Sequence, residues 1–107
     1  MKKFSLLEEE IKKFVDEREW DKFHNPKDLA ISISIESAEL LENFQWRNRD
    51  EIKNLLKNND YRNKISEEIA DIFIYLIILS NKIGINLLEA TFQKIEKNKE
   101  KYSSLIS

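Results

Sequence analysis

The sequence predicts an all-α fold: a single four-helix-bundle-like domain that forms an obligate homo-oligomer. The chain has 107 residues, enough for one hydrophobic core but not for two, so we expect one domain over residues 1–107. A single glycine and a single proline leave little material for turns. Charged residues make up 36% of the chain and are mostly Lys and Glu, which favour helix. Long helices with few connections are therefore expected.

The starts of the first two helices are predicted from capping residues. The first helix is expected from about Ser5 to Glu19, where Ser5 and Glu8 have the spacing of a capping box. The second begins at Pro26, because Asn25 suits an N-cap and proline suits the first helical position. Between them lies a short connection rich in aromatic residues.

The second helix, expected to end near Phe44 or Trp46, has two apolar faces. One face contains Leu29, Ile33, Leu40 and Phe44, with Glu36 in the middle of the stripe. The other contains Ile31, Ile35, Ala38 and Leu41. A peripheral helix of one small bundle seldom needs two apolar faces. The second face therefore predicts self-association, as a homodimer or a homotetramer.

The remaining chain predicts three further elements. A short helix is expected inside the polar stretch 47–60, and a central helix from about Tyr61 to Lys82 ends near Gly84. The central helix is apolar on nearly all sides, which is typical of a helix surrounded by others. A fourth main helix, capped by Asn86, is expected to reach about Tyr102, with residues 103–107 frayed. Its inward face would contain Leu88, Phe92 and Ile95.

Composition argues against several partners. A net charge of −2 gives no basic footprint, so we expect no nucleic-acid polymer as a partner. The absence of cysteine excludes disulfides and thiolate metal sites and fits a reducing compartment. No signal peptide is recognised at the start of the sequence, and the apolar run Ile69–Leu79 is too short to span a bilayer. We therefore expect a cytoplasmic protein without a membrane partner.

Two acidic pairs point to a metal site. Glu36 and Glu39, like Glu68 and Asp71, are three residues apart and so share one helix face. If the two helices pack together, four carboxylates meet and cannot all stay ionised without a cation. Oxygen ligands favour Mg²⁺, with Mn²⁺ as a substitute, and Mg²⁺ commonly takes substrate phosphates as further ligands. Lys94 and Lys101 on the fourth main helix would suit those phosphates.

Other interpretations of these residues remain open. The spacing within each acidic pair is common in Glu-rich helices, so either pair could instead belong to a solvated helix face. The position of Glu36 within an apolar stripe favours the metal site. A di-iron bundle is disfavoured because it uses Glu-x-x-His motifs and His24 has no Glu three residues before it. Trp20 and Trp46 lie near helix ends, where they could pack in the core or stack on a flat ligand.

Four motifs together resemble one known family. They are W-D-x-F-H-x-P at 20–26, E-x-x-E at 36–39 in a segment continuing to Trp46, E-x-x-D at 68–71, and K-x-x-x-N-x-x-K-Y at 94–102. In this order they resemble the MazG-like all-α nucleoside triphosphate pyrophosphohydrolases, closest to the dCTP pyrophosphatase branch. Residues 47–64 show no matching pattern, which leaves the preferred base open.

The resemblance implies Mg²⁺-dependent hydrolysis of a nucleoside triphosphate to a monophosphate and pyrophosphate. The metal ligands would be Glu36, Glu39, Glu68 and Asp71. Among these carboxylates we expect Glu39, or alternatively Glu36, to orient or deprotonate the attacking water. Lys94, Asn98 and Tyr102 match positions around the triphosphate and sugar, and Trp20, His24 and Trp46 match positions around the base. We expect a cytosine nucleotide. The alternative is a non-enzymatic helical module that dimerises or senses nucleotides.

Overall fold

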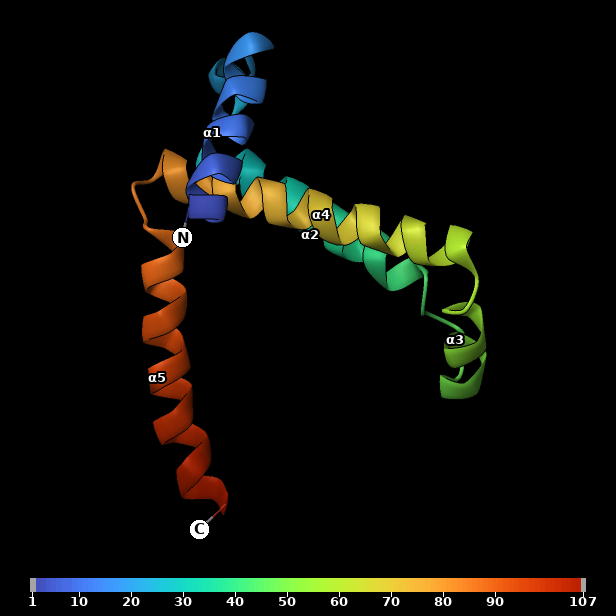
Figure 1. Ribbon diagram of the computed structural model, residues 1–107. Coiled ribbons are helices and arrows are strands. Elements are labelled where there is room, and N and C mark those ends of the chain that lie inside the picture. Colours follow the sequence, from blue (N-terminus) through green and yellow to red (C-terminus); the bar gives the residue numbers. More distant parts are fainter. Residues whose placement is uncertain (1, 107) are drawn as a thin grey trace.

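The computed structural model describes residues 2–106, with the side chains of residues 2–22 and 24–102. Its described part is helical and contains no strand, which confirms the predicted all-α class (Figure 1). The elements are α1 (Lys2–Glu17), the 3₁₀ helix η1 (Trp20–Phe23), α2 (Pro26–Glu42), α3 (Arg49–Leu55), α4 (Asn59–Lys82) and α5 (Leu87–Ile106).

Local sequence signals account for most helix ends. The side chain of Asn25 accepts a hydrogen bond from Asp28 N at 2.8 Å, and Pro26 follows at the first helical position. Gly84 ends α4 with a φ of 74°, a left-handed conformation that glycine adopts without steric cost. The capping box expected at Ser5 is wrong, because α1 already begins at Lys2 and Ser5 lies within it.

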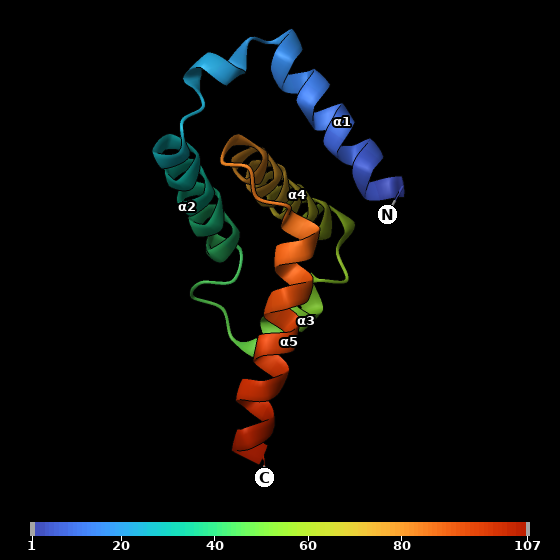
Figure 2. The ribbon, with the colours of Figure 1, turned by 90° about the vertical axis from the view of Figure 1, so that its left-hand side faces the viewer.

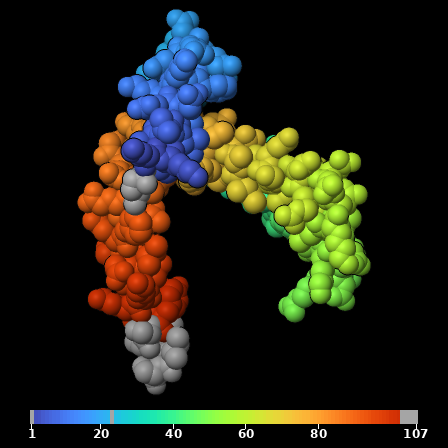
Figure 3. Space-filling model, viewed as in Figure 1, coloured from blue at the N-terminus to red at the C-terminus, as the bar shows by residue number. Residues whose placement is uncertain are grey.

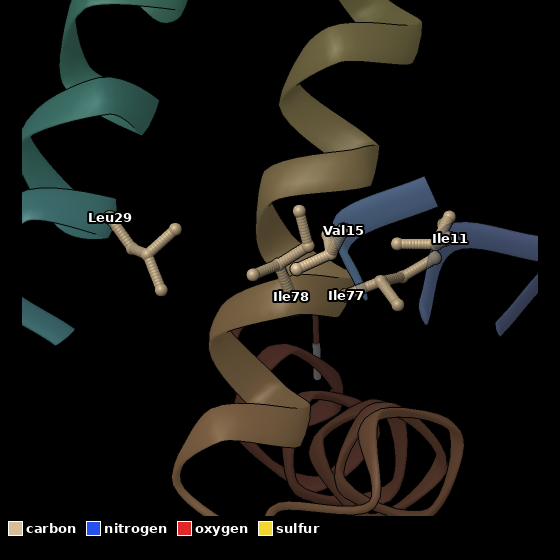
Figure 4. Close-up of a cluster of buried hydrophobic side chains, with 5 residues drawn as sticks. All are labelled: Ile11, Val15, Leu29, Ile77 and Ile78. Atoms are coloured by element: carbon tan, nitrogen blue, oxygen red, sulfur yellow. The ribbon is translucent and has the colours of Figure 1, made fainter. Parts of the chain in front are cut away.

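The centre of the molecule is the pair of helices α2 and α4. They lie side by side and run in opposite directions, and α1 crosses α4 near its C-terminal end (Figure 2). Leu29 from the start of α2 is almost completely buried in a cluster with residues from the other two helices. The cluster, drawn in Figure 4, contains Ile11, Val15, Leu29, Ile77 and Ile78.

Helix α5 does not return to this core. It leaves α4 at a bend of 103° and extends away as a separate arm (Figure 1). The expectation that Phe92 and Ile95 face inward is therefore wrong for a single chain, since both are exposed. The helix also runs past the expected end at Tyr102 as far as Ile106, and Ser107 lies outside the described residues. One chain alone does not close a four-helix bundle.

The chain is far more open than a compact domain of its length. Its radius of gyration is 17.1 Å, against about 13 Å for a compact domain of this size. Its accessible surface is 8747 Å², about 2,400 Å² more than the roughly 6,300 Å² of a typical folded monomer of this mass. Open space separates the arm of α5 from α3 and from the N-terminal end of α4 (Figure 3).

Many large apolar side chains are exposed on this open chain. The second face of α2 is exposed as expected, with Ile35 at 54% of its full accessibility. Helix α4, predicted to be surrounded, instead leaves Ile69, Phe73 and Leu76 exposed. Within the described residues no single helix has the length and apolar composition to cross a membrane, and α4 and α5 meet that criterion only as a bent pair.

Candidate active site

The pairing of α2 with α4 brings the two acidic pairs into one electrostatic environment. Glu36 is half-buried on the side of α2 that faces α4. Its pKa is raised, first because burial removes water from the carboxylate, and then by the negative charges of Glu39 and Asp71. A hydrogen bond with Glu39 and the charge of Glu68 raise it further. Glu36 is therefore close enough to the other three carboxylates identified in the sequence to feel their charges.

The donor chemistry of this group fits a hard divalent cation. All the side chains are carboxylates, and the mutual repulsion felt by Glu36 is the kind that such a cation relieves. Within residues 2–106, no three acidic or histidine side chains are gathered closely enough to hold an ion in their present positions. Glu39 and Asp71 are exposed and so have freedom to move toward a ligand.

One residue of the site was not singled out from the sequence. Asn43 follows α2 as its C-cap and donates a hydrogen bond from Nδ2 to Oε2 of Glu68. Its main-chain carbonyl accepts a hydrogen bond from the hydroxyl of Tyr61 at 2.5 Å. The spacing of seven residues from Glu36 places Asn43 on the same side of the helix, which is the signal that could have identified it.

An aromatic group lies at the opposite end of α2. The rings of Trp20 and His24 meet edge to face at 5.9 Å, and Trp20 also packs against Phe14 at 5.1 Å. Lys82 at the end of α4 binds Oδ1 of Asp21 at 2.7 Å and so fixes η1 to the core. Nδ1 of His24 is buried and has no hydrogen-bond partner within the described residues. The structure thus groups Trp20 with His24, as the sequence suggested.

Trp46 is separated from this aromatic group within the chain. It follows the C-terminal end of α2, whose 17 residues span about 25 Å. Its side chain is 91% exposed, and its φ of 70° lies in the left-handed region that non-glycine residues rarely adopt. Trp20 and Trp46 of one chain are therefore at opposite ends of the same helix.

The polar residues expected near the phosphates lie on α5. Asn98 is half-buried, whereas Lys94, Lys101 and Tyr102 are exposed, with Nζ of Lys101 5.4 Å from the Tyr102 ring centre. Because α5 projects away from the pair α2–α4, the chain does not bring this group to the carboxylates (Figure 1). The predicted site residues are thus divided among three regions of one chain.

Fold and site together define an all-helical protein with two facing pairs of carboxylates between antiparallel helices. The model of the MazG-like family matches residues 31–105, a segment that contains both acidic pairs and α5 up to its last turn. The chain belongs to the MazG-like family, which confirms the resemblance inferred from the motifs.

Similar proteins are known from mammals and from an archaeon. The chain is 33% identical to dCTP pyrophosphatase 1 of Mus musculus and of Homo sapiens, over 83% of its own length and 52% of theirs. It therefore spans about half the length of these curated relatives. Its fold matches the crystal structure of a pyrophosphatase from Archaeoglobus fulgidus with a TM-score of 0.84 and 47% identity, covering 95% of this chain and 93% of the other.

Proposed function

We propose that this protein is a nucleoside triphosphate pyrophosphohydrolase that acts as one domain. It would convert a nucleoside triphosphate and water to the monophosphate and pyrophosphate by breaking the bond between the α- and β-phosphates. The observation that carries this proposal is the packing of α2 against α4, which brings Glu36 and Glu39 on one helix near Glu68 and Asp71 on the other. The similarity to dCTP pyrophosphatase 1 and to an archaeal pyrophosphatase of almost equal length supports the same activity.

The four carboxylates would hold Mg²⁺, with Mn²⁺ as a possible substitute. When bound, the ion supplies positive charge to offset the phosphates and makes water more acidic. Glu39, which is exposed beside the half-buried Glu36, would orient the attacking water and take up its proton. Glu36 is the alternative base. Lys94 and Lys101 would offset the negative charge that develops on the pyrophosphate as it leaves.

The site would be completed by a second copy of the chain. In one chain α5, which carries Lys94 and Lys101, lies away from the carboxylates, and the two tryptophans lie at opposite ends of α2. An excess surface of about 2,400 Å² is ample for a stable interface, which takes about 800 Å² from each partner. A homodimer or homotetramer would bring α5 of one chain against α2 and α4 of another, and would close the four-helix packing.

The base pocket would favour a pyrimidine, as in dCTP. Trp20 and Trp46, contributed by different chains, would stack on the base, and His24 would bind its edge. The buried Nδ1 of His24, which lacks a partner within residues 2–106, leaves a hydrogen-bonding position for a group from outside the chain. The names of the mammalian relatives favour a cytosine nucleotide.

The decisive experiment is pyrophosphate release from a panel of ribo- and deoxyribonucleoside triphosphates, with and without Mg²⁺. We expect release only with Mg²⁺ or Mn²⁺ and fastest with dCTP. The alternative, a non-enzymatic dimerisation or nucleotide-sensing module, predicts nucleotide binding without release. No release from any triphosphate in saturating Mg²⁺ would support that alternative and exclude the enzyme.

A further inference from the structure

Asn43 is the one polar residue that is buried in the described part of the chain, with 6% of its surface exposed. It stands at the C-terminal end of α2, where its side chain contacts the carboxylate of Glu68 and the main-chain carbonyl of Glu39. A buried side-chain amide requires hydrogen-bond partners, and the identity of those partners indicates what the residue does.

The amide of Asn43 connects the two helices of the site. Nδ2 donates to Oε2 of Glu68 on α4, and on α2 it also contacts the main-chain carbonyl of Glu39 at 3.2 Å and that of Leu40 at 3.3 Å. All three partners are acceptors, so the nitrogen of the amide must face them. Tyr61, in the first turn of α4, donates its hydroxyl to the Asn43 carbonyl, which holds the residue from the other side.

We propose that Asn43 is a positioning residue for the metal ligand Glu68; this rests on the proposed function. Its amide occupies Oε2 of Glu68 and ties that carboxylate to the backbone of Glu39, another of the proposed ligands. Oε1 of Glu68 then remains for the cation. Because an amide is neutral, it orients the carboxylate without cancelling the negative charge that attracts the ion, whereas a lysine at this place would compete with the ion.

Partners of metal ligands typically alter metal affinity by about 10–100-fold when they are removed. The test is the dissociation constant for Mn²⁺ in the absence of nucleotide, measured from the electron paramagnetic resonance of the free ion. Asn43→Leu removes the donor at similar size and should weaken Mn²⁺ binding about tenfold or more. In a Glu68→Ala background the same substitution should have little further effect, because the carboxylate that Asn43 orients is gone.

Asn25→Leu is the matched control. Asn25 caps the other end of α2, where it also binds an acidic side chain, donating to Oδ2 of Asp28 at 2.7 Å. Its loss should destabilise the helix but leave the affinity for Mn²⁺ unchanged. If Asn43 served only as a helix cap, both variants would lower the melting temperature and neither would change the affinity.

A measurement on the unaltered protein covers the case in which Asn43→Leu does not fold. The side-chain amide signals of Asn43 should shift on addition of Mg²⁺, while those of Asn25 stay in place. An Asn43 amide that does not respond to saturating Mg²⁺, or an Asn43→Leu variant with unaltered Mn²⁺ affinity, would overturn the positioning role alone. A wild-type protein that binds no Mn²⁺ would instead overturn the metal site and the proposed function with it.

Discussion

Nζ of Lys82 lies 2.7 Å from Oδ1 of Asp21 and 3.2 Å from the main-chain carbonyl of the same residue. The contact joins the last residue of α4 to η1, which lies 61 residues earlier in the chain. Because η1 carries Trp20 and leads directly to His24, this contact sets the position of the aromatic group relative to the core. Through its hydrogen bond and its charge, Lys82 also lowers the pKa of Asp21.

Lys82→Met should raise the pKa of Asp21 toward its ordinary value. A lowered pKa in the folded state contributes stability above the pKa of the unfolded chain, and this contribution is lost as the pH falls through the folded-state value. Wild type should therefore be more stable than Lys82→Met at neutral pH, with the difference vanishing in acid. Carboxyl NMR titration measures the pKa of Asp21, and urea unfolding measures the stability of each protein. Lys53→Met is the control, because it removes the same charge from another helix, α3. Equal stability of wild type and Lys82→Met at neutral pH would contradict it.

Gly84→Ala should destabilise the fold although it causes no clash. A Cβ at this position would meet nothing within 4 Å, but the φ of 74° is unfavourable for a residue with a side chain. The expected loss is about 1–2 kcal/mol in the free energy of unfolding. Gly84→Asn should lose less, because asparagine tolerates this conformation. Urea unfolding at one protomer concentration gives the comparison; equal losses for both variants would point to a cause other than φ.

Signals from neighbouring residues were sufficient to predict the start of α2 and the end of α4, although the capping box expected at Ser5 was wrong. Asn25 and Pro26 start α2, and Gly84 ends α4, because a cap or a left-handed turn is decided within a few residues. The prediction that Phe92 and Ile95 of α5 face inward was wrong for a single chain, since both are exposed. Periodicity indicates that a face is apolar, but it does not identify the chain that covers it.

In the candidate site, too, a local pattern identified some residues and could not identify others. Glu36 was recognisable as an acidic residue in an apolar stripe, and α4 indeed supplies the charges that raise its pKa. Asn43 was not singled out from the sequence, because its partners Glu68 and Tyr61 are 25 and 18 residues away. A long-range hydrogen bond of this kind depends on which helices pair, which no local pattern encodes.

Glu36→Gln should abolish hydrolysis while leaving the metal-free protein at least as stable as wild type. The substitution removes a half-buried charge that is repelled by its neighbours, so repulsion decreases when no cation is present. With Mg²⁺ at 100 times its dissociation constant, wild type should gain about 2.7 kcal/mol and the variant much less. Melting curves in EDTA and in Mg²⁺, with pyrophosphate release beside them, check both effects. Full turnover in excess EDTA would contradict the metal requirement.

Ile35→Glu should dissociate the proposed oligomer. Ile35 lies at the centre of the exposed apolar face of α2, so a charge there would be buried without a partner if this face forms the interface. Light scattering should give wild type a mass of two or more 12.8 kDa chains across a dilution series and should give the variant a smaller one. Asn54→Glu, an exposed position on α3, adds the same charge as a control. A wild-type mass of one chain at micromolar concentration would exclude the oligomer.

Trp46 combines two features that are unfavourable in an isolated chain, an exposed indole and a left-handed backbone. Trp46→Gly should remove the backbone strain, which costs about 1–2 kcal/mol, and so should not destabilise the fold. If the indole stacks on the base, the same substitution should weaken nucleotide binding by about 1–3 kcal/mol, or roughly 5- to 150-fold in affinity. Stability and affinity would then change independently of each other.

Trp46→Phe is the control that separates the two effects, because it keeps an aromatic ring and the strained φ. It should retain most of the nucleotide affinity and show no gain in stability. Affinity is best followed with a non-hydrolysable triphosphate, by the quenching of tryptophan fluorescence in wild type and by calorimetry in all three proteins. If Trp46→Gly binds the nucleotide as wild type does but sediments as a smaller species, the indole packs against another chain and does not stack on the base. Weaker nucleotide binding at unchanged mass would assign Trp46 to the base pocket.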